Sequence, residues 1–296
     1  MRILVTGGAG FIGSHIVDAL RDRGDELIVL DDFSSGRRGN VAPSVELIDA
    51  DIALSRTIDV IANVKVDAVV HAAAQASVPR SMADPKRDRA VNLLGTEHII
   101  SGAKRADAHR VVFLSTGGGI YGNTGEPATE KSLPRPKAFY SVHKYAAERY
   151  LELSGMGYAI ARLANVYGLR QQSNLEGGVV AIFAEGLATR QPITIYGTGE
   201  QRRDFVHVQD VVGALLRMLD SGTNGMWNVG SGQATTINAL LATMEDAIAP
   251  ASAVRYEAAR IGDVFSSCLS VEKIEKELGW RPEISLADGV AMLQTR

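Results

Sequence analysis

A tyrosine and a lysine, Tyr140 and Lys144, stand four residues apart in the chain. On an α-helix, side chains at this spacing lie on one face, one turn apart. A tyrosine with a pKa of about 10 is a poor base at neutral pH, but a nearby ammonium group stabilises the phenolate and lowers that pKa. The pair can then take the proton of an alcohol and return it. Because this spacing is common by chance, the interpretation depends on what precedes it.

Two hydroxyl residues, Ser115 and Thr116, end an apolar segment that begins at Val111. Three glycines follow them. A hydroxyl group at the carboxyl end of a parallel strand points into the ligand crevice of the sheet. Either residue could therefore hydrogen-bond the oxygen of an alcohol that is being oxidised.

At the start of the chain, a short apolar run, Ile3 to Val5, leads into three evenly spaced glycines, Gly7, Gly10 and Gly13. An amphipathic segment follows, with apolar residues at helical spacing. In such a strand–turn–helix unit the first glycine permits a tight turn, and the second lets the backbone approach a pyrophosphate. The third lets the helix pack close to the strand, while free N–H groups at the helix start face the phosphates. The motif stands in the context that dinucleotide binding requires.

A second apolar run, Leu27 to Leu30, ends in Asp31. Asp31 lies close to the spacing of about 20 residues expected for the acid that binds the adenosine ribose. A carboxylate there accepts hydrogen bonds from the 2′-hydroxyl and repels a 2′-phosphate, which favours NAD over NADP. Arg37 and Arg38 could instead receive a 2′-phosphate, but we interpret them as loop residues beside the adenosine.

Strand-like and helix-like segments alternate through the first half of the chain, which predicts an α/β fold: a Rossmann doubly wound parallel sheet with helices on both faces. The helical segments are Arg87 to Lys104 and Phe139 to Leu153. The further strands expected in this half are Val45 to Ile48, Ala68 to His71, Val111 to Ser115 and Tyr158 to Arg162.

The alternation weakens after about Asn165, where loops rich in Gly, Gln and Asn appear and strands become short, as in Ile193 to Tyr196 and Met226 to Val229. We expect residues 1–164 to form an NAD-binding Rossmann domain, to which residues 204–220 return. Residues 165–203 and 221–296 would form a smaller α/β C-terminal substrate lobe.

The bulk composition is that of a globular protein with a full core: 296 residues, 46% hydrophobic and 22% charged. A net charge of −3 gives no indication of a nucleic-acid partner or a membrane surface, and no apolar run approaches the roughly 20 residues of a membrane span. The N-terminus resembles no signal peptide, so we expect a cytoplasmic protein. A single cysteine, Cys268, predicts neither a disulfide nor a cysteine-rich metal site.

Taken in order, these motifs resemble those of the extended short-chain dehydrogenase/reductases that modify nucleotide sugars, and most closely the UDP-glucose 4-epimerases. The resemblance covers essentially the whole chain. Besides the glycine turn, Asp31, the Ser115 strand end and the Tyr140/Lys144 pair, it rests on Asp51-Ile52, His71 to Gln75, Asn92-x-x-Gly95-Thr96, Arg162-x-x-Asn165 to Gly168, Gly199 to Val208 and Leu278-Gly279-Trp280-x-Pro282.

The resemblance implies NAD as cofactor and assigns a binding role to residues of the first half. Those expected at the pyrophosphate are Gly7, Gly10, Phe11, Ile12 and Gly13. Those expected at the adenosine are Asp31, Asp32, Asp51, Ile52 and Asn92. Those expected near the nicotinamide are Ala72, Ala73 and Gln75, with Lys144 on the nicotinamide ribose.

The resemblance also implies a UDP-sugar substrate, with Tyr140 as the acid/base. Guanidinium groups match phosphate oxygens, and Arg203 and Arg260 are expected to bind the substrate phosphates, although Arg202 beside Arg203 leaves open which of the two faces inward. The other residues expected at the substrate are Asn165, Val179, Val180 and Ser267.

The chain departs from many family members at the strand end, where three hydroxyl residues are usual and the third is catalytic. Gly117 stands at that third place, so we assign the hydroxyl role to Thr116, with Ser115 as the alternative. The 4,6-dehydratases carry an Asp-Glu pair after the catalytic threonine, and the decarboxylases a glutamate in that turn, whereas here Gly117 and Gly118 follow. The resemblance therefore favours 4-epimerisation; a dehydratase, a reductase and a non-catalytic NAD-binding protein remain the alternatives.

Two further expectations come from the resemblance. Family members commonly dimerise through two helices per subunit, which predicts a homodimer through residues 87–104 and 139–153. A bulky residue narrows the sugar pocket of some members at the position of Ser267, so the small serine predicts that N-acetylhexosamines are accepted.

Overall fold

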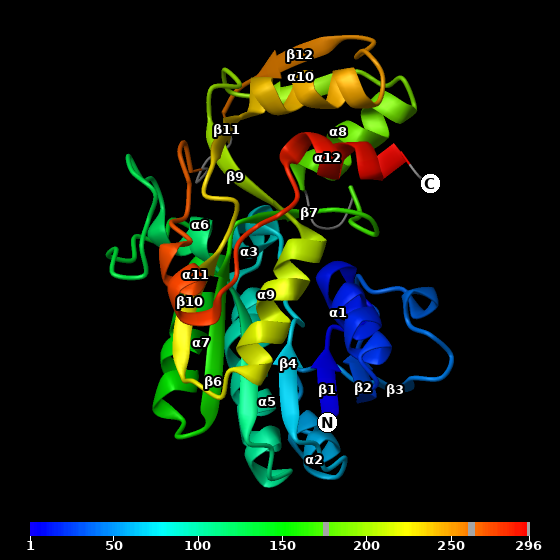
Figure 1. Cartoon of the computed structure of the whole chain (residues 1–296), viewed down its shortest axis with the longest axis vertical. Helices are drawn as coiled ribbons and strands as arrows, with labels where there is room; N and C mark the ends of the chain where they lie inside the picture. Colours follow the sequence, from blue (N-terminus) through cyan, green and yellow to red (C-terminus); the bar gives the residue numbers. More distant parts are fainter. Residues whose placement is uncertain (174–177, 260–263, 295–296) are drawn as a thin grey trace. The chain divides into compact units, whose positions relative to one another are not determined.

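The structure is a computed structural model that describes residues 1–173, 178–259 and 264–294 (Figure 1). The chain forms two compact units, each assembled from separate stretches of sequence. Unit 1 comprises Met1–Thr116, Ala138–Arg162 and Val212–Trp227. Unit 2 comprises Gly117–Lys137, Leu163–Val211 and Asn228–Arg296.

A seven-stranded sheet in the order β10-β6-β5-β4-β1-β2-β3 forms the centre of unit 1. The register pairs Thr6 of β1 with Leu30 on one side and with His71 on the other, and both pairings are parallel. The strand order reverses between β1 and β4, and ligands of doubly wound sheets bind where this happens. The predicted doubly wound Rossmann fold is confirmed. Its strands are β1 (Arg2–Thr6), β2 (Glu26–Asp31), β3 (Glu46–Asp49), β4 (Ala68–His71), β5 (Arg110–Thr116), β6 (Gly157–Leu163) and β10 (Gly225–Val229).

Alternate side chains of these strands face opposite layers of helices. Leu4 and Phe113 lie in one buried cluster with residues of α2, α5 and α7, whereas Val29 packs near Val17 of α1. Helices therefore cover both faces of the sheet, as the buried, uninterrupted apolar strands require. The helices are α1 (Phe11–Asp22), α2 (Thr57–Ala62), α3 (Val78–Ala83), α4 (Pro85–Arg89), α5 (Gly95–Arg105), α7 (Phe139–Leu153) and α9 (Val208–Asp220), with a π-helical turn η2 (Ala90–Leu94) and a 3₁₀ turn η1 (Arg38–Asn40).

Two elements differ from the sequence-based expectations. The helix expected over Arg87 to Lys104 is interrupted by η2, which separates α4 from α5. The strand expected in the smaller lobe at Met226 to Val229 is β10, which pairs with β6 at the edge of the large sheet. A π-helical turn inserts an extra residue into a helix without changing its hydrophobic pattern much, and pairing partners of an edge strand are not visible in its own sequence.

Unit 2 is built on two small sheets and the helices that pack against them. Strand β9 pairs in parallel with β7 and antiparallel with β11, and β12 pairs in parallel with β8. Phe183, Leu240 and Met244 lie in its buried core. Its elements are α6 (Gly117–Tyr121), β7 (Asn165–Tyr167), α8 (Val179–Ala188), β8 (Ile193–Tyr196), β9 (Arg202–His207), β11 (Ala234–Thr236), α10 (Ile237–Ala247), β12 (Val254–Glu257), α11 (Glu272–Leu278), α12 (Leu286–Ala291) and the 3₁₀ turn η3 (Met292–Gln294).

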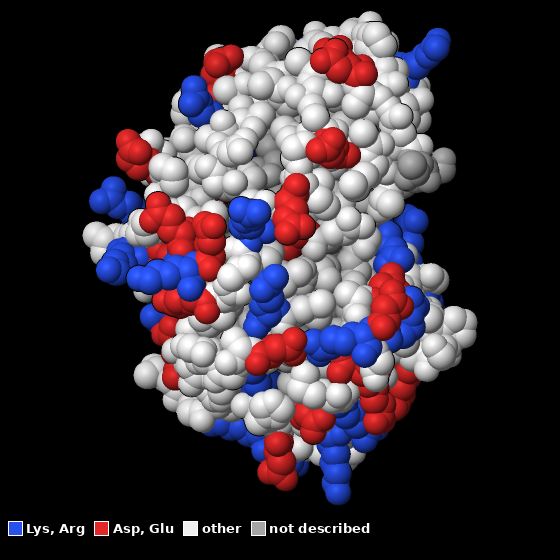
Figure 2. All heavy atoms as spheres, viewed as in Figure 1, with Lys and Arg blue, Asp and Glu red and all other residues white. Residues whose placement is uncertain are grey.

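Acidic and basic side chains are intermixed on the face shown in Figure 2. Within the described ranges, none of the helices combines the length and apolarity needed to cross a membrane. The same residues contain no cluster of three or more His, Cys, Asp or Glu side chains that could hold a metal ion.

Candidate active site

The glycine turn between β1 and α1 has no room for side chains at two of its three positions. Gly7 has φ +69°, and a Cβ there would lie 2.6 Å from the backbone nitrogen of Ala73; a Cβ at Gly13 would collide with the carbonyl oxygen of Gly7. A Cβ at Gly10 would meet Gly7 O at 3.2 Å and otherwise, among the described atoms, open space. This glycine cradle, a tight turn with open space at Gly10, leaves its backbone open to a ligand, which fits the pyrophosphate of NAD.

Asp31 ties this turn to the end of β2. Its Oδ2 accepts a hydrogen bond from Ala9 N at 2.9 Å, and its Oδ1 accepts one from Phe33 N at 2.9 Å. The side chain is buried, which raises the pKa of Asp31, although the two N–H groups act in the opposite direction. An ionised carboxylate has about four lone-pair sites, so Asp31 retains acceptor capacity for a ribose hydroxyl.

The adenosine side contains an ion pair that the sequence did not reveal. Arg87, on α4, lies 3.2 Å from the Asp51 carboxylate and 3.9 Å from that of Asp32. Asp51 also accepts a hydrogen bond from Ala53 N at 2.8 Å. The neighbouring Ile52 is 5% exposed and packs beside α5. The predicted adenosine residues Asp32 and Asp51 are therefore brought together, with a cation between them.

The loop after β4 is held by two hydrogen bonds to a buried asparagine. Asn92, 1% exposed in η2, donates to Gln75 O at 2.9 Å and accepts from Gln75 N at 3.1 Å. Ala72 N donates to Thr6 O at 3.0 Å, and Ala73 backs the glycine turn. Asn92, expected from the resemblance beside the adenine, thus has a visible role in fixing the backbone that lines the crevice.

His71, the last residue of β4, is buried and neutral. The Thr96 hydroxyl donates to Asn92 O, so it must accept from His71 Nε2, which lies 3.1 Å away. Nδ1 then accepts from the Thr6 hydroxyl at 2.7 Å. Burial and the charge of Lys144 lower the pKa of His71 well below its usual value of 6.5. His71 therefore joins β1 to α5 and does not compete for the role of general base.

Helix α7 carries Tyr140 in its first turn, half-buried, and Lys144 one turn later, 2% exposed. The Lys144 ammonium lies 4.0 Å from the centre of the Phe113 ring. Burial lowers the pKa of Lys144 from 10.5 to about 7, against the attraction of Glu148 and Asp88. Lys144 is therefore a weakly hydrated ammonium whose charge the buried carboxylates support only in part.

Ser115 is engaged by a buried ion pair between Glu148 of α7 and Arg162 of β6. Its hydroxyl donates to Glu148 Oε1 at 2.5 Å, and Arg162 contacts Glu148 through Nε at 3.0 Å and Nη2 at 2.6 Å. All three side chains are at most 3% exposed. Thr116, the next residue, is half-buried and lies on the opposite side of the strand from Ser115.

In unit 2 the predicted substrate residues lie on β7, on α8, on β9 and in the segment before α11. Asn165 donates to Asp204 O at 3.3 Å, and half-buried Arg203 donates to Arg202 O at 2.9 Å. Val179 is half-buried, whereas Val180 is 2% exposed and belongs to the core of the unit. Arg260 lies outside the described residues.

The glycines that follow β5 are enclosed by this same unit. A Cβ at Gly117 would lie 2.6 Å from Leu269 Cδ1, and one at Gly118 would lie 2.7 Å from Ser267 Oγ. Ser267 itself is 4% exposed, and its N–H donates to Arg202 O at 3.1 Å. The turn after Thr116 therefore accepts glycine without strain and has no room for larger residues unless its neighbours move.

Sequence reasoning assigned no role to His143 and Glu148, which lie on the tyrosine–lysine helix, or to Asp88, which contacts it from α4. Glu148 could have been found, because it follows Lys144 by four residues on a helix face that also carries the buried Leu151. Asp88 had no comparable signal, since it stands among charged neighbours in a short helix.

Comparison with known proteins gives consistent results. The model of the NAD dependent epimerase/dehydratase family matches residues 3–230. A putative UDP-glucose 4-epimerase of Methanocaldococcus jannaschii is 39% identical, covering 97% of this chain and 95% of the relative. The structure of a Thermotoga maritima UDP-glucose 4-epimerase with UDP-glucose has a TM-score of 0.96 at 38% identity, covering 99% of this chain and 97% of that one. A Thermus thermophilus UDP-glucose 4-epimerase in complex with NAD has a TM-score of 0.94 at 38% identity, covering 100% and 99%. With the glycine cradle, the buried lysine and these matches in agreement, the chain belongs to the NAD-dependent epimerase/dehydratase family.

Proposed function

We propose that the protein is a UDP-sugar 4-epimerase that interconverts UDP-glucose and UDP-galactose through a 4-keto sugar. The observation that carries this proposal is the combination of a tyrosine–lysine pair on α7 with glycines directly after β5, where no acid or base stands. The similar structures with UDP-glucose and with NAD add support.

Tyr140 takes the proton of the sugar 4-hydroxyl and returns it at the end of the cycle. The Lys144 ammonium, buried one turn away, stabilises the phenolate that does this. Thr116 donates a hydrogen bond to the oxygen being oxidised. Ser115 is a poorer candidate, because its hydroxyl is already donated to Glu148.

NAD is held by the glycine turn and Asp31, with Lys144 on its nicotinamide ribose. When bound, NAD supplies the acceptor for the hydride that leaves the sugar carbon. The protein keeps the cofactor oriented through the backbone of the loop after β4, which Asn92 fixes.

The turn after Thr116 favours epimerisation over elimination or decarboxylation. A dehydratase or decarboxylase of this family needs a carboxylate in that turn, and side chains at Gly117 or Gly118 would collide with Leu269 or Ser267. An epimerase needs no further acid or base, because the ketone only has to present its other face.

The nucleotide is bound by unit 2 in this proposal. Arg203 and Arg260 pair with the diphosphate, Asn165 contacts the sugar nucleotide, and Val179 borders the nucleobase beside Val180. We also propose a homodimer formed through α7 and the helices α4 and α5 that cover the predicted range 87–104.

The decisive experiment is incubation of the purified protein with UDP-glucose, UDP-galactose and UDP-glucuronate, each deuterated at C4. We expect the two hexoses to reach the same mixture from either side, with deuterium retained and no net NADH formed. A product lighter by one water identifies a dehydratase, release of CO₂ a decarboxylase, and unchanged substrate with bound NAD a non-catalytic protein; each result contradicts the proposal.

The matched control is Tyr140→Phe, which removes one hydroxyl from the surface of α7. We expect folded protein with normal NAD affinity by calorimetry and a kcat reduced by about 10²-fold or more, the scale of general acid–base catalysis. Near-normal kcat in this variant would contradict the proton role of Tyr140.

A further inference from the structure

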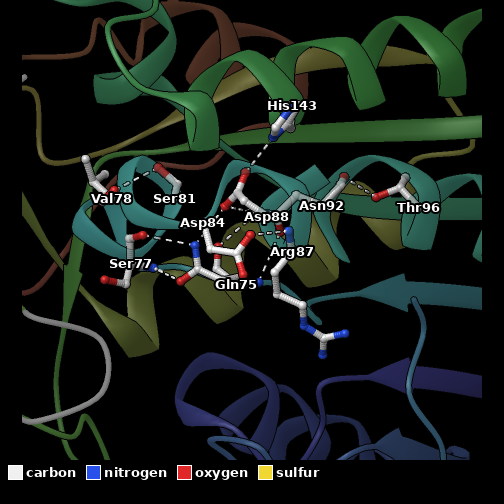
Figure 3. Close-up of polar contacts among 10 residues, drawn as sticks. All are labelled: Gln75, Ser77, Val78, Ser81, Asp84, Arg87, Asp88, Asn92, Thr96 and His143. Atoms are coloured by element: carbon white, nitrogen blue, oxygen red, sulfur yellow. Dashed lines mark hydrogen bonds and ion pairs between the residues drawn. The ribbon is translucent and has the colours of Figure 1, made fainter. Parts of the chain in front are cut away.

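Asp88, on the short helix α4, is the centre of a buried polar cluster (Figure 3). The residue is 1% exposed. Its Oδ1 accepts hydrogen bonds from Gln75 Nε2 at 2.7 Å and Asn92 Nδ2 at 2.9 Å, and its Oδ2 accepts one from His143 Nδ1 at 2.6 Å. A carboxylate removed from water is tolerated only when it is satisfied in this way. Asp88 thus joins the loop after β4 and helix α7, both distant in sequence, to the adjoining turn η2.

Two of the three segments form the wall beside the cofactor in the proposed function. Gln75 lies in the loop after β4, where its side chain also accepts from Ser77 N at 2.7 Å and donates to Ser77 O at 3.0 Å. Asn92 brackets the Gln75 peptide from the π-helical turn. Both amide hydrogens of each side chain are used, so the loop and η2 are locked to each other with Asp88 as the shared acceptor.

The third segment is the helix that carries the catalytic pair. His143 follows Tyr140 by three residues and immediately precedes Lys144. Its ring stacks on Phe139 at 6.1 Å with an interplanar angle of 23°, and its Nδ1 donates to Asp88. The N-terminal half of α7 is therefore attached to α4 through one short hydrogen bond.

We propose that Asp88 is a positioning residue for the epimerisation, fixing the Tyr140–Lys144 face of α7 through His143 and the cofactor loop through Gln75 and Asn92. This inference rests on the proposed function for its kinetic consequences. The geometry means that the proton-transfer pair and the cofactor wall share one buried anchor, so neither can shift without straining the other.

The charge of Asp88 has a second consequence, because it faces Lys144. The titratable groups that act on this ammonium are Glu148 on its own helix, Asp88 on α4 and His71, neutral, on β4. His143, the residue before Lys144, is hydrogen-bonded to Asp88. Asp88 and Glu148 raise the pKa of Lys144, and burial lowers it. Removal of the charge at Asp88 should therefore lower the pKa of Lys144 further.

His143 variants test the anchor. His143→Leu removes the hydrogen bond to Asp88, and we expect kcat to fall by about 10-fold to 100-fold with KM and NAD affinity near wild type, because small displacements of catalytic groups are costly. His143→Asn places an amide N–H near the position of Nδ1 and should recover most of kcat. Wild-type kcat in His143→Leu, or an equal loss in both variants, would overturn the proposal.

Asp88→Asn tests the charge separately from the contacts. Its amide oxygen can still accept from Gln75 and Asn92, and its amide nitrogen can donate to His143 in the other tautomer. We expect the alkaline limb of the kcat–pH profile to move to lower pH, because Lys144 loses its proton earlier. Asp59→Asn, an exposed carboxylate on α2, is the matched control and should leave the limb unchanged. An unmoved limb in Asp88→Asn contradicts the inference.

The two proposals fail in different ways. If the wild type turns over no UDP-hexose, the proposed function fails, and Asp88 is then tested by NMR titration of the Lys144 side chain with NAD bound. A Lys144 pKa that falls in Asp88→Asn but not in Asp59→Asn supports the anchor without reference to turnover. Should His143→Leu not fold, Asp88→Asn carries the test alone, and an unaltered Lys144 titration overturns it.

Discussion

Lys144 is the residue in which stability and chemistry oppose each other most directly. Its ammonium is buried against Phe113, where it can stabilise a phenolate but loses the hydration it has in the unfolded chain. The pKa of Lys144 lies at about 7 because the cost of desolvating the ammonium exceeds the attraction of Glu148 and Asp88. Such a group is retained for what it does and not for the stability it adds.

Lys144→Met is therefore expected to stabilise the protein and abolish turnover. Between the folded pKa of about 7 and the unfolded value of about 10.4, the unfolded chain binds more protons, so wild-type stability rises with pH across this window. Methionine removes this dependence. Thermal denaturation of the cofactor-free protein at pH 6 and pH 10 should give the variant its larger advantage at pH 6; a variant less stable than wild type at pH 6 would contradict the desolvation argument.

A single side chain, Ser267, also allows a test of which UDP-sugars the protein accepts. Its hydroxyl abuts Gly118, immediately after the strand end that carries Thr116. We expect UDP-N-acetylglucosamine to be accepted together with UDP-glucose, and Ser267→Tyr to lower kcat/KM for the acetylated substrate more than for UDP-glucose. The ratio of the two kcat/KM values is the measurement, with Ser266→Tyr as the neighbouring control. If Ser267→Tyr leaves the ratio of the two kcat/KM values unchanged, the side chain at this position does not determine which sugars are accepted.

Helix α7 depends on an ion pair that is almost removed from solvent. Arg162 of β6 donates hydrogen bonds to Glu148 from two nitrogens. The partly exposed Arg149 approaches the same carboxylate at 3.8 Å. The Coulombic gain in such a pair is set against the cost of desolvating both groups. The ion pair contributes to the fold by fixing α7 against β6 beside Ser115.

Arg162→Met should therefore destabilise the protein by about 3–5 kcal/mol, since it leaves a buried carboxylate without its main cation. The double variant Arg162→Met with Glu148→Leu removes both charges, and we expect it to recover most of the loss in urea denaturation. A single variant as stable as wild type would mean that Arg149 or solvent compensates fully.

Sequence patterns predict helices and strands best where residues close in the sequence determine the element. Residues 139–153 were predicted to be a helix, and α7 has those bounds, because its apolar spacing is regular and prolines precede it. The π-helical turn at Ala90–Leu94 was missed, since one inserted residue leaves the surrounding pattern helical. Likewise, the strand at residues 225–229 was recognised, but its place beside β6 depends on residues far along the chain.

The same distinction applies to the candidate site. The glycine turn and Asp31 can be recognised from the sequence because dinucleotide binding requires particular residue types at fixed spacing. The Asp88 cluster does not, because its members come from three segments and each is ordinary alone. Buried polar networks are properties of the assembled fold, and they have no sequence period by which they could be found.

At the scale of the whole molecule, an exposed apolar stripe on α7 bears on the proposed homodimer. Phe139, Val142, Tyr150 and Leu153 are large, apolar and 41–87% exposed, and their spacing places them along one stripe of the helix. Contiguous apolar surface of this kind marks interaction sites. The stripe supports the proposed homodimer.

Light scattering at micromolar concentration should give the mass of a dimer for the wild type. Val142→Glu with Leu153→Glu introduces two charges into the stripe and should give a monomer that retains NAD. Leu54→Glu, an exposed leucine outside α7, serves as the control and should remain dimeric. A monomeric wild type, or a dimer that survives both glutamates, would exclude this interface.

The placement of β10 has a consequence for synthesis on the ribosome. Chains emerge from the N-terminus and their domains begin to fold as they emerge. The sheet of unit 1 starts at residue 2 but takes its edge strand from residues 225–229, after residues 163–211 of unit 2 have been made. Throughout that interval β6 presents an unpaired edge, a template for strands of other nascent chains. The order in which the strands are made therefore exposes this architecture to aggregation during translation.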